Sequence, residues 1–280
     1  MMTSPYILDF GMHEGEDTEF YLALGAKVIA FEGNPKLVER NKVRFAAEIE
    51  SGALTIVAGA IVPPEHEGET VTFYTSDDKS VWGTADTDWV ERNKARGFPM
   101  NEVVTPAVKL EKVLAELPRA YYVKVDIEGA DEIVLHSLDR TNYLPEYISI
   151  ESENVDFDGL VGEVEQLKAM GYTRFAAVQQ ATIPGSRLQA EGFHGKPVDY
   201  RFRKHASGAF GEFLPDDAFK SAEEVIEDYR KIFRSYRTFG APSPLRRNRL
   251  TRFPLRVLNY ALLNTINYPL CGWHDLHAKR

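Results

Sequence analysis

The sequence predicts an α/β protein with a doubly wound sheet of about seven strands. Short apolar runs, such as residues 6–10 and 120–125, alternate with longer segments whose apolar residues recur at helical spacing. Continuous apolar runs are typical of buried parallel strands, and parallel neighbours need a helix to connect them. The first run is followed by a turn with two glycines, Gly11 and Gly15, and then by a helix. A strand, a glycine turn and a helix in this order favour a doubly wound sheet.

The first turn and the second strand predict a nucleoside site. Gly11 and Gly15 carry no Cβ, so the backbone there can approach a ligand. Glu32 ends the second strand, 17 residues after Gly15, close to the spacing of roughly 20 residues at which a carboxylate binds ribose hydroxyls. Asp9 and Glu14 add two acids, which favour a cationic nucleoside. S-adenosylmethionine, with a sulfonium and an amino group beside its ribose, fits this description.

Three alternatives remain open from these residues. An ordinary turn with an acid at the start of the helix gives the same short pattern around Gly11. A nicotinamide-dependent oxidoreductase would bind a pyrophosphate with Gly-x-Gly-x-x-Gly, whereas the turn here is Asp-x-Gly-x-x-x-Gly, so this class is disfavoured. A non-catalytic binding protein with a methyltransferase-like site would bind the cofactor without turnover.

Composition excludes several classes of protein. The chain has 280 residues, 44% of them hydrophobic and 27% charged, which suits a full core. A single cysteine, Cys271, suits a reducing compartment, and we find no secretory leader pattern and no run of 18 apolar residues. We therefore expect a cytoplasmic protein with no membrane span. From Arg237 onward there are eight Lys/Arg and one acid, which leaves −16 on the first 236 residues, so nucleic acid is not an expected partner.

Turn and cap residues divide the chain into elements. Helices are expected over residues 17–24, 35–49, 108–117, 131–138, 160–170 and 221–236, with Asn34 and Ser221 as N-caps. Strands are expected over residues 6–10, 27–32, 54–58, 70–74, 120–125, 147–151, 173–179 and 199–203, the last two as an edge hairpin. We predict one domain over residues 1–215, with residues 61–100 as an inserted substrate or lid region. Residues 216–280 form a mostly helical extension that packs on the domain or on a partner.

A second acidic site follows the strand at residues 120–125. Asp126 and Glu128 lie just past its carboxyl end, where ligands bind in open α/β sheets, and Glu151 ends the next strand. Asp126 or Glu128 could accept the proton of a substrate hydroxyl as a methyl group arrives, so both are candidate catalytic residues. A pair of these acids could instead hold a divalent cation, or one could cap the following helix. We expect no resident metal.

Three segments in this order resemble the FkbM family of S-adenosylmethionine-dependent methyltransferases. They are Asp9-Phe10-Gly11-x-x-x-Gly15, the segment AFEGNP at residues 30–35 and the segment VKVDIEGAD at residues 123–131. The second is similar to the family's A-F-E-P-N-P and the third to its L-K-I-D-V-E-G-A-E. Gly33 stands at the usual proline, Asp131 at the usual glutamate, and His13 at a position that is commonly asparagine-like.

The resemblance implies a class I methyltransferase fold, which is Rossmann-like, and methyl transfer to a hydroxyl of a small molecule, sugar, glycan or secondary metabolite. It also implies that Asp9, Gly11 and Gly15 hold the methionine end of S-adenosylmethionine and that Glu32 binds its ribose. The remaining implied cofactor residues are His13, Glu14, Gly33, Asn34, Gly59, Ala60 and Asp126. Positioning supplies much of the barrier reduction in such a displacement, and a base such as Asp126 or Glu128 would help a weakly acidic alcohol to react.

The candidate substrate residues lie in loops. Ser80 and Trp82 belong to a polar loop that forms either a substrate wall or a surface excursion with Trp82 in the core. Glu151 ends a strand. His205 lies in a segment similar to a loop of some FkbM-like chains, although a solvent-facing histidine is the simpler interpretation.

The C-terminal third contains a basic amphipathic segment. Residues 245–270 mix five arginines with leucine, valine and isoleucine. Such a helix packs on the domain, forms a homodimer, or makes a peripheral contact with an anionic membrane or a phosphorylated substrate carrier. Packing or dimerisation is favoured. His274, Asp275 and His277 could contribute to a zinc site, but no further protein ligand is identifiable, so we favour a docked tail.

Overall fold

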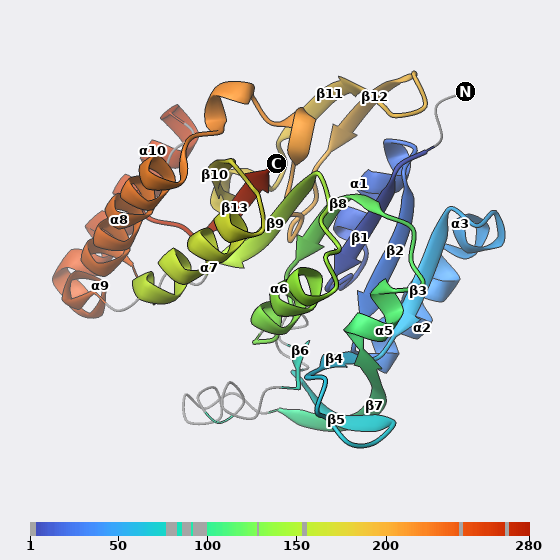
Figure 1. Ribbon diagram of the computed structural model, residues 1–280. Helices are drawn as coiled ribbons and strands as arrows, with labels where there is room; N and C mark the ends of the chain where they lie inside the picture. The colour runs from blue at the N-terminus through green and yellow to red at the C-terminus, as the bar shows by residue number, and fades with distance from the viewer. Residues whose placement is uncertain are drawn as a thin grey trace. The chain divides into compact units, whose positions relative to one another are not determined.

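The main sheet has seven strands in the order β10-β13-β9-β8-β1-β2-β3, which confirms the predicted doubly wound α/β class (Figure 1). The computed structural model describes residues 4–76, 83–85, 91, 100–127, 129–152, 156–240, 243–266 and 269–280. The chain divides into two compact units. Unit 1 comprises residues 1–148 and 189–200, and unit 2 comprises residues 149–188 and 201–280.

Unit 1 holds the first strands of the main sheet and a smaller sheet. Its elements are β1 (Tyr6–Phe10), α1 (Glu16–Ala23), β2 (Lys27–Glu32), α2 (Pro35–Arg44), α3 (Ala46–Glu50), β3 (Leu54–Ala58), β4 (Ala60–Val62), β5 (Thr70–Thr75), β6 (Gly83–Thr84), β7 (Asn101–Lys109), α5 (Leu110–Leu114), β8 (Ala120–Val125) and α6 (Asp131–Arg140).

Unit 2 holds the later strands and the long helices. Its elements are α7 (Phe157–Ala169), β10 (Arg174–Gln179), the 3-10 turns η1 (Gln180–Thr182), η2 (Gly211–Phe213) and η3 (Asp216–Ala218), α8 (Ala222–Phe239), α9 (Pro244–Arg247), α10 (Arg249–Ile266) and β13 (His274–Lys279). The division between the units falls inside β9 (Tyr147–Ser152), β11 (Arg187–Glu191) and β12 (Pro197–Arg201).

Parallel pairing in unit 1 brings three loops to one edge of the sheet. β1 pairs with β2 on one side and with β8 on the other, and β2 pairs with β3, all in parallel. Apolar side chains on both faces make these strands buried, and the rings of Phe10 and Phe31 stack at 4.3 Å. Because the carboxyl ends of parallel strands point the same way, the loops after Phe10, Glu32 and Val125 meet at that edge.

The helix predicted over residues 35–49 is in fact two helices. Asn34 caps α2 as predicted, because its side chain accepts the N–H of Lys36, and Pro35 occupies the first turn. The helix stops at Arg44, since Phe45 has φ −108° and ψ 29°. The Phe45 ring is buried and lies against Gly15, which explains the interruption.

Directly after the predicted insert at residues 61–100 lies a strand that the sequence analysis missed. Residues 101–109 form β7, which pairs with β4 in parallel and with β5 antiparallel in a four-stranded sheet. The helix predicted over residues 108–117 is therefore wrong at its start. Lys109 is extended, at φ −83° and ψ 94°, and the helix covers only Leu110–Leu114. The β-branched residues at 103–105 favour the strand.

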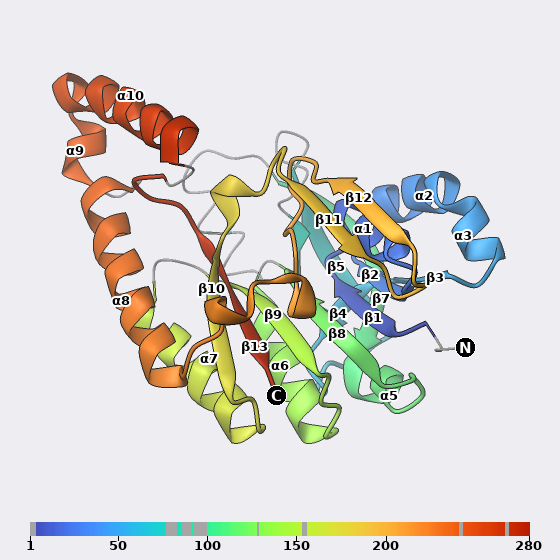
Figure 2. The same ribbon diagram turned by 90° about the horizontal axis from the view of Figure 1, so that it is seen from above.

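In unit 2 the predicted edge hairpin is wrong. β10 pairs antiparallel with β13, so that Arg174 is opposite Lys279, while β12 pairs with β11 in a separate two-stranded sheet. The tail therefore forms a strand. Figure 2 shows β13 beside β10 along its length. The sequence did not predict this strand because polar residues usually indicate an exposed segment, whereas His274, Asp275 and His277 are all buried in the fold.

Helices of unit 2 begin and pack as their sequence indicates. The predicted capping box at α8 is confirmed: the Ser221 hydroxyl accepts the N–H of Glu224, whose carboxylate accepts the N–H of Ser221. α7 and α8 lie together through the rings of Phe157 and Phe233. In the part of the chain that the structure describes, no helix has the length and apolar character needed to cross a bilayer. The domain boundary near residue 215 stays a prediction.

Candidate functional site

Most backbone N–H groups of the turn between β1 and α1 already have hydrogen-bond acceptors within the protein. Phe31 in β2 accepts, through its carbonyl, the N–H groups of Gly11 at 3.1 Å and Met12 at 3.0 Å. The His13 N–H binds the Glu32 carboxylate at 2.8 Å, and the Gly15 N–H binds the carbonyl of Met12 at 2.8 Å. Four of the five N–H groups in residues 11–15 therefore have protein acceptors, and they do not form a phosphate cradle.

Glu32 lies at the carboxyl end of β2, where its side chain joins two loops. One carboxylate oxygen accepts the His13 N–H, and the other accepts the Asn34 N–H at 2.8 Å. Burial raises the pKa of Glu32 to about 7, although the two N–H donors and the neighbouring His13 oppose the shift. Each oxygen keeps a second lone pair, so this carboxylate can still accept hydroxyl donors from a ligand.

His13 is held in an uncommon backbone conformation at the centre of the turn. Its φ is 52°, and its Nδ1 lies 3.1 Å from a carboxylate oxygen of Glu16. Burial of the ring alone would lower the pKa of His13. The hydrogen bond to Glu16 and the charges of Glu16, Glu32 and Glu14 outweigh burial and raise it. The Asn41 side-chain amide donates to the His13 carbonyl at 2.7 Å and fixes the turn against α2.

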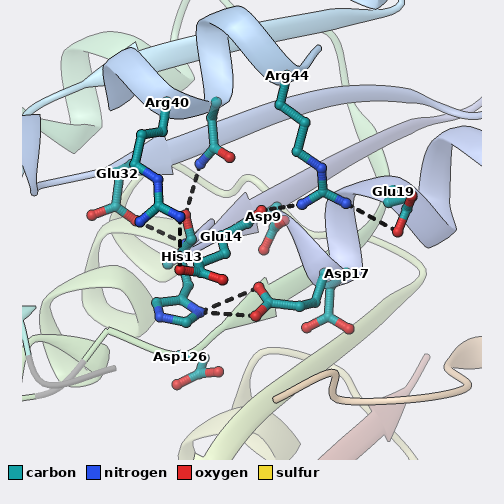
Figure 3. A network of polar contacts seen from close by, with 12 residues as sticks. Asp9, His13, Glu14, Asp17, Glu19, Glu32, Arg40, Arg44 and Asp126 are labelled. Carbon is teal, nitrogen blue, oxygen red and sulfur yellow. Dashed lines mark hydrogen bonds and ion pairs between the residues drawn. The ribbon is translucent and has the colours of Figure 1, made fainter. Parts of the chain in front are cut away.

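Acidic side chains surround this turn (Figure 3). The labelled acids are Asp9, Glu14, Asp17, Glu19, Glu32 and Asp126. Arg40 pairs with Glu14 at 3.2 Å, and Arg44 reaches Glu19 at 3.1 Å and the Glu14 carbonyl. The first turn of α1 adds Glu16 to Asp17 and Glu19, so the positive end of that helix faces carboxylates. This environment favours a cationic ligand over a phosphate.

A buried lysine connects the turn to β8. Lys124 is 3% exposed, and its ammonium lies 3.5 Å from Asp9, 3.6 Å from Asp17 and 3.1 Å from Asp126. It also donates to the carbonyl of Gly11 at 3.2 Å. Burial would lower the pKa of Lys124, but the charges of Asp126, Asp9 and Asp17 hold it well above its usual value.

Asp9 is fully buried and takes its contacts from inside the protein. Thr18 donates its hydroxyl to one carboxylate oxygen of Asp9 at 2.6 Å. The other oxygen has no hydrogen bond among residues that the structure describes, but it faces Lys124. Burial raises the pKa of Asp9, although Lys124 and Thr18 oppose this. The carboxylate thus fixes the base of the turn.

The end of β8 presents the second acidic site. Asp126 follows the strand with a side chain 37% exposed, and its N–H binds the carbonyl of Phe10 at 3.0 Å. Asp131 accepts the N–H of Ile127 at 3.1 Å, and burial raises the pKa of Asp131 to about 7. A half-exposed carboxylate at this edge is able to accept a proton from a bound molecule.

The glycines of the predicted site face protein atoms. A Cβ on Gly11, whose φ is 90°, would lie 1.9 Å from the carbonyl oxygen of Asp126. A Cβ on Gly15 would lie 2.5 Å from the Phe45 ring, and one on Gly33 would lie 2.6 Å from the Phe73 ring. Close packing of the turn against Asp126 and Phe45, and of Gly33 against Phe73 in β5, therefore already favours glycine at these positions.

The structure describes in unit 1 only some of the residues predicted for the site. Glu128, Ser80 and Trp82 lie outside the described residues. Gly59 connects β3 to β4, which begins at Ala60, and the Gly59 N–H binds the carbonyl of Glu32 at 2.9 Å. Glu151 and His205 belong to unit 2, where His205 is exposed and has a φ of 69°.

Lys124 and Thr18 are among the residues of the turn and its surroundings that the sequence analysis missed. Lys124 occupies an otherwise apolar strand, and a lysine in a buried strand needs carboxylates around it, which is a signal that could have identified it. Thr18 gave no signal, because its role depends on the turn that brings α1 under Asp9. Within the described ranges no three side chains of His, Cys, Asp or Glu are placed to hold a metal ion.

Comparisons with known proteins find one family model, described as the methyltransferase FkbM domain, which matches residues 9–174. A probable ribosomal RNA small subunit methyltransferase A from Methanospirillum hungatei is 45% identical over 56 residues, which are 20% of this chain and 22% of that protein. The chain thus matches about a fifth of the length of this curated relative.

Three of the solved structures with a similar fold are described as methyltransferases. A methyltransferase FkbM from Methylobacillus flagellatus is 15% identical, covers 62% of this chain and 40% of its own, and has a TM-score of 0.39. An S-adenosylmethionine-dependent methyltransferase from Archaeoglobus fulgidus is 12% identical, with 99% and 87% coverage and a TM-score of 0.37. A precorrin-6y C5,15-methyltransferase from Geobacter metallireducens is 14% identical, with 72% and 78% coverage and a TM-score of 0.36.

Proposed function

The chain belongs to the FkbM methyltransferase family, and from that premise we propose that it transfers a methyl group from S-adenosylmethionine to a hydroxyl of a sugar, glycan or other small molecule. The acceptor is expected to be neutral or cationic, because the first 236 residues carry a net charge of −16.

The chemistry of the turn supports S-adenosylmethionine as the cofactor. This molecule carries a sulfonium and an amino group and has no phosphate, so it suits a turn that is lined by carboxylates and has few N–H groups left over. The same features oppose a nicotinamide dinucleotide, whose pyrophosphate needs free N–H donors at a helix start. The oxidoreductase alternative is therefore the weaker one.

The position and orientation of the Glu32 carboxylate are the observation that supports the proposal most directly. Its carboxylate ends β2, is 7% exposed and is oriented by two backbone N–H donors, as a group that binds two ribose hydroxyls needs to be. His13 and Asn34 bind it directly, Glu14 follows His13 in the turn, and these residues would complete the contacts to the cofactor. Asp9 would act through the turn that it fixes with Thr18 and Lys124.

When bound, S-adenosylmethionine supplies an electrophilic methyl group for an in-line displacement. The protein must then hold the acceptor oxygen in line and take up its proton. Asp126 is the candidate base, since it is the partly exposed carboxylate at the carboxyl end of β8 and Lys124 holds it at 3.1 Å. Glu128 remains a second candidate from the sequence.

Isothermal titration with S-adenosylhomocysteine tests the cofactor site. We expect micromolar binding by the wild type, loss of binding in Glu32→Ala, and no change in Glu50→Ala, which removes an exposed acid of α3. NADH serves as the comparison ligand. Binding of NADH in place of S-adenosylhomocysteine would support the oxidoreductase alternative. Absence of binding to either ligand would contradict the proposal.

Incubation with methyl-labelled S-adenosylmethionine tests the acceptor class. Sugars, glycans and small alcohols form one panel, and an RNA panel addresses the class named for the M. hungatei relative. We expect label in a sugar or small-molecule ether, which resists mild alkali, and a loss of labelling in Asp126→Asn that is larger than any loss of cofactor affinity. Labelled RNA, or label in an alkali-labile ester, would contradict hydroxyl methylation of a small molecule.

A further inference from the structure

The ring of Phe73 in β5 lies between two glycines that are far apart in the chain. A Cβ on Gly33 would lie 2.6 Å from Cε2 of this ring, and a Cβ on Gly83 would lie 3.0 Å from its Cε1. These two carbons are on opposite edges of a phenyl ring, so the ring separates the loop after β2 from the strand β6. Phe73 is only 7% exposed, so its contacts are with protein groups.

The backbone conformation at residue 33 does not by itself need a glycine. Gly11 and Gly15 have φ values of 90° and 83°, in the left-handed region that favours glycine, whereas Gly33 lies outside that region. An alanine could therefore adopt the backbone of residue 33. Apart from the adjacent residues, the three atoms nearest to its Cβ would all belong to the Phe73 ring. The ring is thus what favours glycine there.

The strand that carries Phe73 is paired on both sides. Phe73 is opposite Val103 of β7, and the next residues of β5 pair with β6, where Thr75 is opposite Gly83. A ring that moved away from Gly33 would approach the backbone of Gly83. Side chains on paired strands hold their positions more precisely than side chains on loops. Phe73 therefore fixes the loop after β2.

This loop supplies one of the two backbone N–H groups that orient Glu32. Asn34 donates to one carboxylate oxygen at 2.8 Å, and His13 donates to the other at 2.8 Å (Figure 3). Asn34 directly follows Gly33, so a shift of residue 33 moves the Asn34 N–H and leaves the His13 N–H in place. We propose that Phe73 is a positioning residue of the cofactor site: its ring fixes the backbone of Gly33 and thereby one N–H donor of Glu32.

The consequence for catalysis rests on the proposed function, in which Glu32 binds the ribose hydroxyls of S-adenosylmethionine. Both carboxylate oxygens must then be held in place. Phe73 would act on cofactor affinity without touching the cofactor, from the four-stranded sheet and not from the main sheet. The effect on the Glu32 carboxylate itself needs no ligand and is measurable in the free protein.

NMR titration of the side-chain carboxyl groups in the free protein tests the contact. Glu32→Gln identifies the Glu32 signal by its loss, and we expect a wild-type midpoint near the Glu32 pKa of about 7. Gly33→Ala should raise the midpoint by roughly one pH unit, because displacement of the Asn34 N–H removes a hydrogen bond that favours the ionised form. Adding Phe73→Leu should return the midpoint toward the wild-type value.

The charges around Glu32 stay the same in these variants. His13 and Asp9 act on Glu32 from β1 and its turn, α2 presents Arg40 paired with Glu14, and neither β3 nor β5 contains a charged residue. Gly162→Ala is the control, since Gly162 also lies outside the left-handed region and has nothing within 4 Å of its Cβ position. An unchanged midpoint in Gly33→Ala, or one that Phe73→Leu does not return, would overturn the proposal.

Titration with S-adenosylhomocysteine measures the effect on the cofactor. Gly33→Ala and Phe73→Ala should each weaken binding roughly tenfold, and their effects should not add, because both release the same contact. Phe233→Ala removes a ring of similar burial in unit 2 and should leave the affinity unchanged. Additive losses would contradict the role of Phe73. Absence of binding by the wild type would contradict the proposed function alone, because the NMR titration reports on Phe73 without a ligand.

Discussion

Asp9 and Lys124 lie opposite each other on the adjacent parallel strands β1 and β8, and their charged groups are 3.5 Å apart in the protein core. Both side chains are almost completely buried. Two charges in such a place are compatible with folding only as a pair, because an isolated buried charge costs several kcal/mol. The pair also fixes the glycine turn, since Lys124 donates to the carbonyl of Gly11.

Removal of the lysine charge should destabilise the protein strongly. We expect Lys124→Met to lower the free energy of unfolding by about 3–5 kcal/mol, since it leaves Asp9 and Asp17 without their cation. Chemical denaturation measures this, with Lys42→Met as the control, because Lys42 is exposed and pairs only at the surface with Glu39. The double variant with Asp9→Asn should recover part of the loss. Strictly additive effects would show that the pair is not coupled.

The close approach of Gly11 to β8 predicts a steric cost. Gly11→Ala should destabilise the protein by about 1–3 kcal/mol more than Gly52→Ala, because only the Cβ at Gly11 would meet backbone, 1.9 Å from the carbonyl oxygen of Asp126. Gly52 has a similar positive φ of 71° and nothing within 4 Å, so the comparison removes the backbone contribution. Thermal unfolding of both variants measures the difference, and equal losses would mean that the turn moves away without cost.

The raised pKa of Glu32, about 7, predicts that cofactor affinity depends on pH. The ionised carboxylate accepts two hydroxyl donors, so binding of S-adenosylhomocysteine should strengthen as pH rises through 7 and weaken below it, by up to about tenfold per pH unit. Titration at several pH values measures this. Glu32→Gln should bind more weakly and without that dependence. A dependence that persists in Glu32→Gln would implicate His13, whose pKa is also raised.

The buried histidines of β13 predict sensitivity to acid. Burial lowers the pKa of His274 to about 4 and that of His277 to about 3. Between these values and the unfolded value near 6.5, the unfolded chain binds protons that the folded protein does not, so stability is lost as pH falls through this window. At pH 5 each histidine should cost roughly 2 kcal/mol. His277→Leu should reduce the acid dependence of unfolding, and His136→Leu, at an exposed position on α6, should not.

Local patterns predicted the parallel core because they match its physical requirements. The apolar runs at residues 6–10, 27–32 and 120–125 are strands, and Asn34 and Ser221 cap helices where the sequence placed them. Strands buried on both faces and capped helices depend on residues that are close together in the chain. The family resemblance came from the same segments, and the match to residues 9–174 confirms it.

The sequence by itself determined the parallel sheet, its family and the acids near its carboxyl edge. The tertiary structure decided which charges meet: Lys124 pairs with Asp9, Asp17 and Asp126, and Glu32 accepts the N–H groups of His13 and Asn34. It also decided that the polar tail is a strand. Pairing with β10 satisfies the backbone hydrogen bonds of this segment, although its polar side chains suggest an exposed segment when the sequence is considered alone. Lys124 and Gly11, for example, are 113 positions apart, and no local pattern encodes which buried charge compensates another.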